Sequence, residues 1–140
     1  MPSTRLPGRA LLFPLLLMII MQGAPVHATT DLRGAWSGTF YSNHEGVAPF
    51  TITVVINKDS SGRIVGSSTL ASQCLKNAQL HVTVTGSTVV LAGSDQAGDN
   101  MTVRGSLDNS GTVLNSTYVL NGSAGGGCET DDGTGNLTKR

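Results

Sequence analysis

The side chains of this sequence that could perform chemistry are few, and two of them, His44 and Glu45, lie together. A histidine beside a carboxylate can bind a metal ion or act as an acid–base pair. A solvated surface loop would contain the same two residues without any reaction. A further histidine, His81, occupies a polar position in an alternating segment, where a solvated strand residue is expected. Because no H-E-x-x-H or G-x-S-x-G pattern adds a second catalytic role, we do not expect an enzyme.

Acidic side chains gather in two later segments of the chain. The first segment contains Asp95 and Asp99, and the second contains Glu129, Asp131 and Asp132. Carboxylates from two loops could bind Ca²⁺, but their spacing differs from that of an EF-hand loop. Solvation of a glycine-rich loop explains the same residues without an ion. We therefore expect neither a metal site nor a cofactor, and regard these five residues, like the histidine–glutamate pair, as candidate loop contacts.

Cys74 and Cys128 are the only cysteines. In an exported chain, two cysteines favour one disulfide, and these two do not form the C-x-x-C pair of a redox site. The bond would close a loop of about 55 residues, which the chain-entropy model values at about 4 kcal/mol. A small core that is poor in aromatic residues would depend on such a contribution.

The first 28 residues have the pattern of a secretory signal peptide. Arg5 and Arg9 give a positive start, residues 10–21 are apolar, and Val26-His27-Ala28 supplies a small–x–small cleavage site. An apolar run of 12 residues is too short to span a bilayer, so we expect no transmembrane anchor in the mature chain. Residues 29–140 should form one exported domain, in a bacterial periplasm or outside the cell.

The charge of the predicted mature chain is nearly balanced. It contains seven basic and nine acidic residues, for a formal charge of −2, and its basic residues do not cluster. Nucleic acids and anionic membranes bind basic clusters, so the composition argues against both as partners.

Alternation of apolar and polar residues predicts an all-β fold of about eight short strands, separated by turns rich in Gly, Ser, Asn and Asp. Residues 72–78 break the alternation and predict one short helical turn with Ser72 as N-cap. Short connections favour an antiparallel up-and-down barrel, and a two-sheet sandwich is the alternative. Glycines would supply the bends that closure needs, at positions 34, 38, 66 and 105. The predicted strands cover residues 32–41, 49–57, 63–70, 79–85, 88–92, 101–107, 112–121 and 134–140.

The first predicted strand has the only tryptophan at the centre of one face, which consists of Leu32, Gly34, Trp36, Gly38 and Phe40. The Gly34-x-Trp36 motif and the terminal basic pair Lys139-Arg140 resemble the calycin group of secreted barrels, which includes lipocalins and avidins. The resemblance implies that Lys139 or Arg140 packs across Trp36 at the closed end of a barrel. It does not extend to biotin binding, because the further tryptophans of avidin are absent.

The resemblance also implies a binding or inhibitory module and not a catalyst. Such a barrel would take a small apolar or amphipathic ligand at its open end, between residues 42–46, 93–100 and 122–133. The alternative is a protein-interaction factor, such as an inhibitor of a secreted enzyme or a surface antigen that host molecules contact. Its contact would be the 122–133 loop. We expect a monomer in either case, with its partner at the loops and not at Trp36.

Overall fold

Strands form in this chain where apolar and polar residues alternate, because that pattern buries one face of a sheet and leaves the other in water. A computed structural model of the chain describes residues 30–70 and 74–140, and these residues form eight strands. The predicted signal peptide lies outside the described residues. The strands are β1 (Gly34–Ser42), β2 (Phe50–Lys58), β3 (Ile64–Ser68), β4 (Ala78–Thr85), β5 (Thr88–Ser94), β6 (Asn100–Leu107), β7 (Val113–Asn121) and β8 (Asp131–Lys139).

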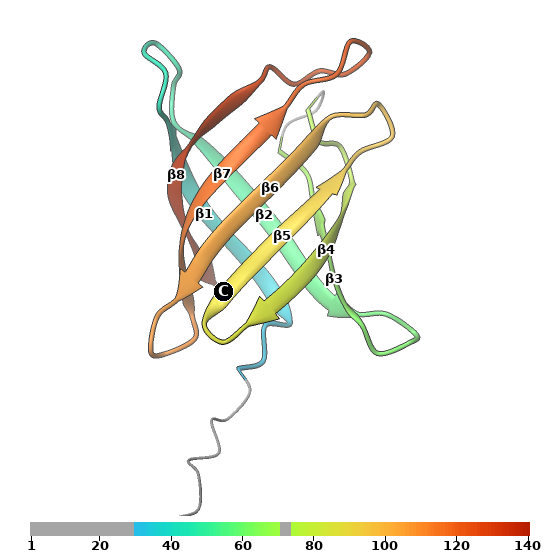
Figure 1. Cartoon of the computed structure of the whole chain (residues 1–140), viewed down its shortest axis with the longest axis vertical. Coiled ribbons are helices and arrows are strands. Elements are labelled where there is room, and N and C mark those ends of the chain that lie inside the picture. The colour runs from blue at the N-terminus through green and yellow to red at the C-terminus, as the bar shows by residue number, and fades with distance from the viewer. Residues whose placement is uncertain (1–29, 71–73) are drawn as a thin grey trace, which may run out of the picture.

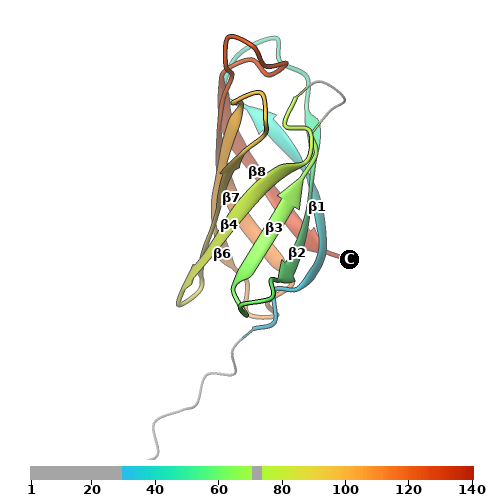
Figure 2. The same ribbon diagram turned by 90° about the vertical axis from the view of Figure 1, so that its right-hand side faces the viewer.

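Each strand pairs antiparallel with its neighbours in sequence, and β8 returns to β1 to close a barrel (Figures 1 and 2). At the seam between β1 and β8, Trp36 lies opposite Lys139 and Phe40 lies opposite Gly135. The predicted up-and-down barrel is therefore confirmed, and the alternative sandwich does not form.

Side chains from all eight strands fill the barrel. Phe40, Phe50 and Tyr118 form a cluster in which the ring centres of each pair lie 5.3–6.4 Å apart. Tyr118 meets both phenylalanines edge to face, a geometry that stabilises a core beyond the area it buries. Aliphatic residues occupy the rest of the interior, and those with the least exposure include Ile52, Val54, Ile56, Leu80, Val89, Leu91, Met101, Val103, Leu114 and Leu137.

Two of the glycines predicted at bends lie where neighbouring strands touch. A Cβ added to Gly38 would lie 1.6 Å from the carbonyl oxygen of Asn136 on β8, and one on Gly105 would lie 2.6 Å from that of Asn115 on β7. No side chain fits at either position, so glycine allows the strands to approach. Close approach of strands does not require glycine at position 66, because an added Cβ would lie 3.4 Å from its nearest neighbour, an ordinary van der Waals contact.

One end of the barrel, which we call the turn end, carries the short connections 59–63, 86–87 and 108–112. Trp36 plugs this end: it is 2% exposed, and its indole nitrogen donates a hydrogen bond to the carbonyl oxygen of Leu32 at 2.8 Å. The Lys139 Nζ lies 6.0 Å from the centre of the indole, at the outer limit of a cation–π contact. Arg140 instead donates from Nε to the Ser37 hydroxyl. Of the two candidates, Lys139 is the residue beside the tryptophan.

The helical turn predicted over residues 72–78 is wrong. Ser72 lies outside the described residues, residues 74–77 form bends and turns and no helix, and Ala78 already begins β4. Leu75 and Asn77 adopt φ angles of 49° and 52°, in the left-handed region that a right-handed helix excludes. The cause is tertiary, since Leu75 is fully buried and Cys74 is bonded to a distant loop. Across residues 30–70 and 74–140, no helix is long and apolar enough to span a membrane.

Candidate functional site

The opposite end of the barrel, which we call the loop end, carries the other four connections between strands, three of which are longer than any at the turn end. They are residues 43–49, 69–77, 95–99 and 122–130, and 71–73 within the second are not described. Figure 1 shows them gathered at the top of the barrel. The three segments that were predicted to share one end of the barrel therefore do so.

A disulfide between Cys74 and Cys128 joins the second of these loops to the fourth. The predicted pairing is confirmed, across a sequence separation of 54 residues. Beside the bond, Leu75 is fully buried in the same hydrophobic cluster as Phe40 and Tyr118. The loop end is therefore covered by an apolar side chain and a covalent link, where the sequence had suggested an open mouth.

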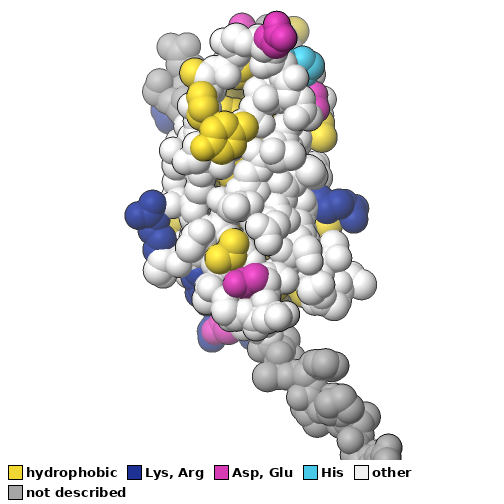
Figure 3. All heavy atoms as spheres, turned by 90° about the vertical axis from the view of Figure 1, so that its left-hand side faces the viewer, with side chains coloured by type: hydrophobic (Ala, Val, Ile, Leu, Met, Phe, Trp, Pro, Cys, Tyr) yellow, Lys and Arg dark blue, Asp and Glu magenta, His cyan; other side chains and the backbone are white. Residues whose placement is uncertain are grey.

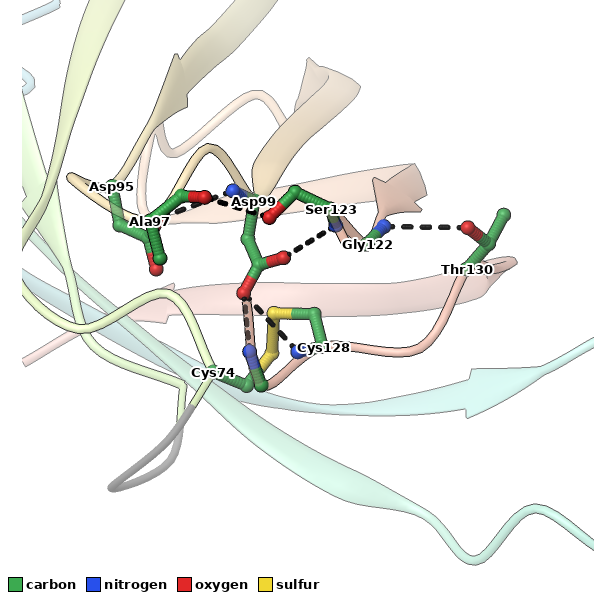
Figure 4. The surroundings of a disulfide bond; sticks show 9 residues. Cys74, Asp95, Ala97, Asp99, Gly122, Ser123, Cys128 and Thr130 are labelled. Carbon is green, nitrogen blue, oxygen red and sulfur yellow. Dashed lines mark hydrogen bonds between the residues drawn. A yellow bond between two sulfur atoms is a disulfide. The ribbon is translucent and has the colours of Figure 1, made fainter. Parts of the chain in front are cut away.

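Asp99 is fully buried beneath the third and fourth loops. Its Oδ1 accepts a hydrogen bond from the backbone nitrogen of Ser123 at 2.7 Å, and its Oδ2 accepts from those of Gly127 and Cys128 at 2.9 and 3.1 Å (Figure 4). These donors, Ser123 foremost, hold the pKa of the Asp99 carboxyl below its ordinary value. One ionised carboxylate thus fixes a loop that is rich in glycine and would otherwise have little to order it.

The residues around the Asp99 carboxylate pack closely against it and hydrogen-bond one another. A Cβ on Gly126 would lie 1.9 Å from the Asp99 Oδ1, so a side chain has no room there. The Ser123 hydroxyl donates to the carbonyl oxygen of Ala97 at 2.7 Å, and the Asp99 backbone nitrogen donates to the Asp95 carboxylate at 3.1 Å. The third and fourth loops therefore form one hydrogen-bonded unit.

A second polar cluster joins β1 to β8 at the rim of the loop end. The buried Asp131 carboxylate accepts hydrogen bonds from the hydroxyls of Tyr118 at 2.6 Å and Ser42 at 2.5 Å. The His44 Nε2 lies 2.8 Å from Asp132 Oδ1 and 3.9 Å from Asp131 Oδ1. The Ser42 hydroxyl thus points to a carboxylate and not to the His44 ring. The Ser42 side chain and the His44 ring therefore do not form a hydrogen-bonded serine–histidine pair.

The ionisation states of Tyr118 and Asp131 suit a structural link between strands. Burial, together with the neighbouring Asp131 carboxylate, raises the pKa of the Tyr118 hydroxyl well above its ordinary value. Burial opposes ionisation of Asp131, but hydrogen bonds from Ser42 and Tyr118 keep the pKa of this carboxyl below its ordinary value. Asn43 and then His44 lower the pKa of Asp132. At neutral pH, Tyr118 therefore acts as a hydroxyl donor to a charged carboxylate.

The candidate loop contacts divide into buried and accessible residues. Asp99 and Asp131 are buried, so their carboxylates hold the loop end together and are not available to a partner. Within the described parts of the chain, no group of three histidine, cysteine or acidic side chains could hold a metal ion. The candidates that remain exposed or half-buried are His44, Glu45, Asp95, Glu129 and Asp132.

The two ends of the barrel differ in charge. Six acidic residues lie at the loop end, namely Glu45, Asp95, Asp99, Glu129, Asp131 and Asp132. Lys76 is the single lysine or arginine in the described part of that end. The turn end has the opposite balance: its acidic residues are Asp31, Asp59 and Asp108, and its basic residues are Arg33, Lys58, Arg63, Lys139 and Arg140. The barrel is therefore polarised along its axis.

Across the described residues, the side chains of the barrel core are almost completely buried. A cavity of about 10 Å³ lies beside Trp36 and is lined by aliphatic side chains, among them Leu32, Ile56 and Leu114. That volume is about the least that admits one water molecule. Pockets for small organic ligands are usually about 300–1,000 Å³.

Comparison with known proteins gave no family for this chain. No protein-family model matched it, and neither did any curated protein or solved structure. Function must therefore be inferred from the residues of the chain itself.

Proposed function

We propose that this chain is an exported, non-catalytic protein-interaction module that contacts its partner through the loop end. The observation that carries the proposal is the filled interior, in which the cavity beside Trp36 measures only about 10 Å³. A barrel whose interior is filled with side chains has no room for a ligand inside, so a partner must bind to its outer surface. A module for a small apolar ligand, the first expectation from sequence, would require this core to open.

The fixed geometry of the loop end supports this assignment. The Cys74–Cys128 disulfide and the buried Asp99 carboxylate hold three of the four loops relative to one another. Loops that are ordered before binding lose less conformational entropy when a partner docks. The first loop is linked to β8 by Asn43 and His44, whose side chains hydrogen-bond the Asp132 carboxylate. This loop carries Val47, 45% exposed, close to the charged Glu45. An apolar contact next to charged groups is suited to a protein surface.

The charge of the loop end indicates the kind of partner. Its exposed carboxylates favour a partner with a basic face, which they would attract at long range. Export is part of the proposal as well, since the disulfide is consistent with an oxidising compartment and residues 1–28 have the pattern of a signal peptide. The closed eight-stranded barrel and Lys139 beside Trp36 favour a calycin-like relationship.

Site-specific photo-crosslinking in the exported fraction of the native cells tests the proposal. A photoreactive residue would replace Glu129 or Val47 at the loop end, and Asn109 at the turn end would serve as the matched control. We expect the two loop-end positions to capture the same protein and position 109 to capture none. The captured partner should then bind the Glu45→Lys variant about tenfold or more weakly, with Asn109→Lys unaffected, and binding should weaken as salt rises.

Two results would contradict the proposal. One is equal crosslinking from position 109, which would remove the distinction between the two ends. The other is a small molecule that stays bound in native mass spectrometry and raises the melting temperature. That outcome would support the small-ligand function instead.

A further inference from the structure

The outer wall of the barrel contains a groove where β7, β8 and β1 lie side by side. This wall groove has a volume of about 530 Å³ and extends from the loop end along the seam between β1 and β8. A second hollow of about 360 Å³ shares Gly38, Thr39 and Thr138 with it and ends at Arg140. The residues that line the wall groove are Gly38, Thr39, Tyr41, Asn115, Ser116, Thr134, Gly135, Asn136 and Thr138.

The side chains on this wall are held in register by strand pairing. Tyr41 on β1 lies opposite Thr134 on β8, and Asn136 on β8 lies opposite Asn115 on β7. The Tyr41 side chain is 56% exposed, which leaves its ring in solvent at the loop-end side of the groove. Within the described residues, the side chains of these four residues make no hydrogen bond. Their hydroxyl and amide groups are therefore available to a ligand.

The groove differs from both ends of the barrel because no charged side chain lines it. Figure 3 shows that the face it views is largely uncharged, with a hydrophobic patch near the top, an acidic and a hydrophobic side chain in its lower part, and other charged side chains toward its margins. The wall groove itself has no lysine or arginine, and Arg140, at the far end of the second hollow, donates to the Ser37 hydroxyl. The lining of the wall groove therefore does not favour a phosphate or a sulfated chain. With one aromatic ring among hydroxyls and amides, it also does not suit a lipid.

We propose that the wall groove binds a neutral oligosaccharide. A sugar ring offers an apolar face of C–H bonds and a rim of hydroxyl groups. The exposed ring of Tyr41 provides a flat surface for the apolar face, and the amides of Asn115 and Asn136 can both donate to and accept from the hydroxyls. The second hollow lengthens the groove toward Arg140, so an extended chain of several sugars fits better than a monosaccharide. This site lies on the wall and is independent of the protein contact proposed at the loop end.

Calorimetric titration with cellohexaose, chitohexaose and maltohexaose tests the proposal on the full exported chain. We expect at least one of the three to bind, and to bind more tightly than its disaccharide. The Tyr41→Ala variant should lose about tenfold or more in affinity, whereas Tyr41→Phe, which keeps the ring, should lose less. Val119→Ala removes an exposed apolar side chain from a position of β7 that does not line the groove, and this variant should bind as the parent does.

Folding is checked separately, because each variant should melt within a few degrees of the parent. Should Tyr41→Ala fail to fold, Asn136→Ala tests the same groove, with an expected loss of affinity. The proposal is overturned if none of the three hexasaccharides binds at millimolar concentration, or if binding is indifferent to both substitutions. Tighter, Tyr41-dependent binding of a heparin-derived hexasaccharide would contradict the requirement for a neutral ligand.

Discussion

The two ends of this barrel are closed by different physical means. The turn end is closed by packing, with Trp36 buried among aliphatic side chains and its indole nitrogen bonded to the Leu32 carbonyl. The loop end is held by a disulfide and by the buried carboxylates of Asp99 and Asp131, which accept hydrogen bonds from other loops and strands. One end therefore depends on apolar burial, and the other depends on a covalent bond and polar contacts.

This difference indicates which end of the barrel is better suited to contact a partner. A turn end made of short connections has little freedom to vary without damaging the core. The loop end carries long connections whose tips remain exposed although their bases are fixed, and this is the usual arrangement of binding loops on a rigid scaffold. Substitutions that disrupt one end at a time should separate the contribution of apolar packing to stability from that of the disulfide and the polar contacts.

The largest effect should come from the turn end. Trp36→Ala removes the largest buried side chain and leaves a cavity, which should lower the free energy of unfolding by about 3–5 kcal/mol. Trp36→Phe keeps part of the packing and should lose less. Urea denaturation of both variants measures the difference. A loss below about 1 kcal/mol for Trp36→Ala would show that the indole does not close the barrel.

Removal of the disulfide should be the next largest effect. The double variant Cys74→Ser/Cys128→Ser should lose about 2–4 kcal/mol of stability, because its unfolded chain is no longer cross-linked. Reductant provides the matched control: it should destabilise the parent to the level of the double variant and leave the double variant unchanged. Equal stability of the parent with and without reductant would contradict this role.

The sequence allowed the turn end to be predicted more completely than the loop end. Alternation placed Trp36 on the inner face, and the calycin resemblance left Lys139 or Arg140 to pack across it. The strand register then shows that Lys139 lies opposite Trp36. Val84 shows the limit of this reasoning. It alternates like a core residue, yet it is 42% exposed because the tip of the β4–β5 hairpin projects from the barrel (Figure 2).

The loop end was harder to predict because its contacts are distant in sequence. The disulfide could be inferred, since two cysteines in an exported chain have one pairing. The burial of Asp99 could not, because its partners lie 24–29 residues away in a glycine-rich segment with no alternation. An aspartate between glycine and asparagine resembles an ordinary turn residue. The one local signal was the run of glycines at 125–127, which leaves backbone nitrogens accessible to an acceptor.

A smaller but specific loss is expected for Asp99→Asn, which turns one acceptor oxygen into a donor against backbone N–H groups. The melting temperature should fall by roughly 5–10 °C. Asp95→Asn is the matched control, because an amide keeps one oxygen for the single hydrogen bond that Asp95 accepts from Asp99, and it should cost less. An equal effect of the two substitutions would contradict a special role for Asp99.

The same carboxylate should make stability depend on acid. The folded-state pKa of Asp99 is below its ordinary value, so its contribution is complete above the unfolded pKa of about 4. The contribution is lost as pH falls from there through the folded pKa. Urea midpoints measured between pH 7 and pH 2.5 should therefore fall less in Asp99→Asn than in the parent. Parallel curves would be inconsistent with an ionised Asp99.

The smallest effect should come from the exposed ion pairs of the turn end. Arg33 contacts Asp31 at 2.7 Å, but both side chains are more than half exposed. Water and salt screen such a pair, so Arg33→Ala should shift the melting temperature by less than about 2 °C, and by nothing measurable at high salt. A shift as large as that of Asp99→Asn would mean that the two ends do not differ as described.

Amide hydrogen exchange tests most directly the claim that the loop end is a fixed surface. The backbone nitrogens of Ser123, Gly127 and Cys128 lie in a glycine-rich loop, but each donates to Asp99. We predict exchange at least about a hundredfold slower than in an unstructured chain, with this protection lost in Asp99→Asn while Val113 at the turn end stays protected. Exchange of the three amides at nearly unstructured rates in the parent would contradict the account.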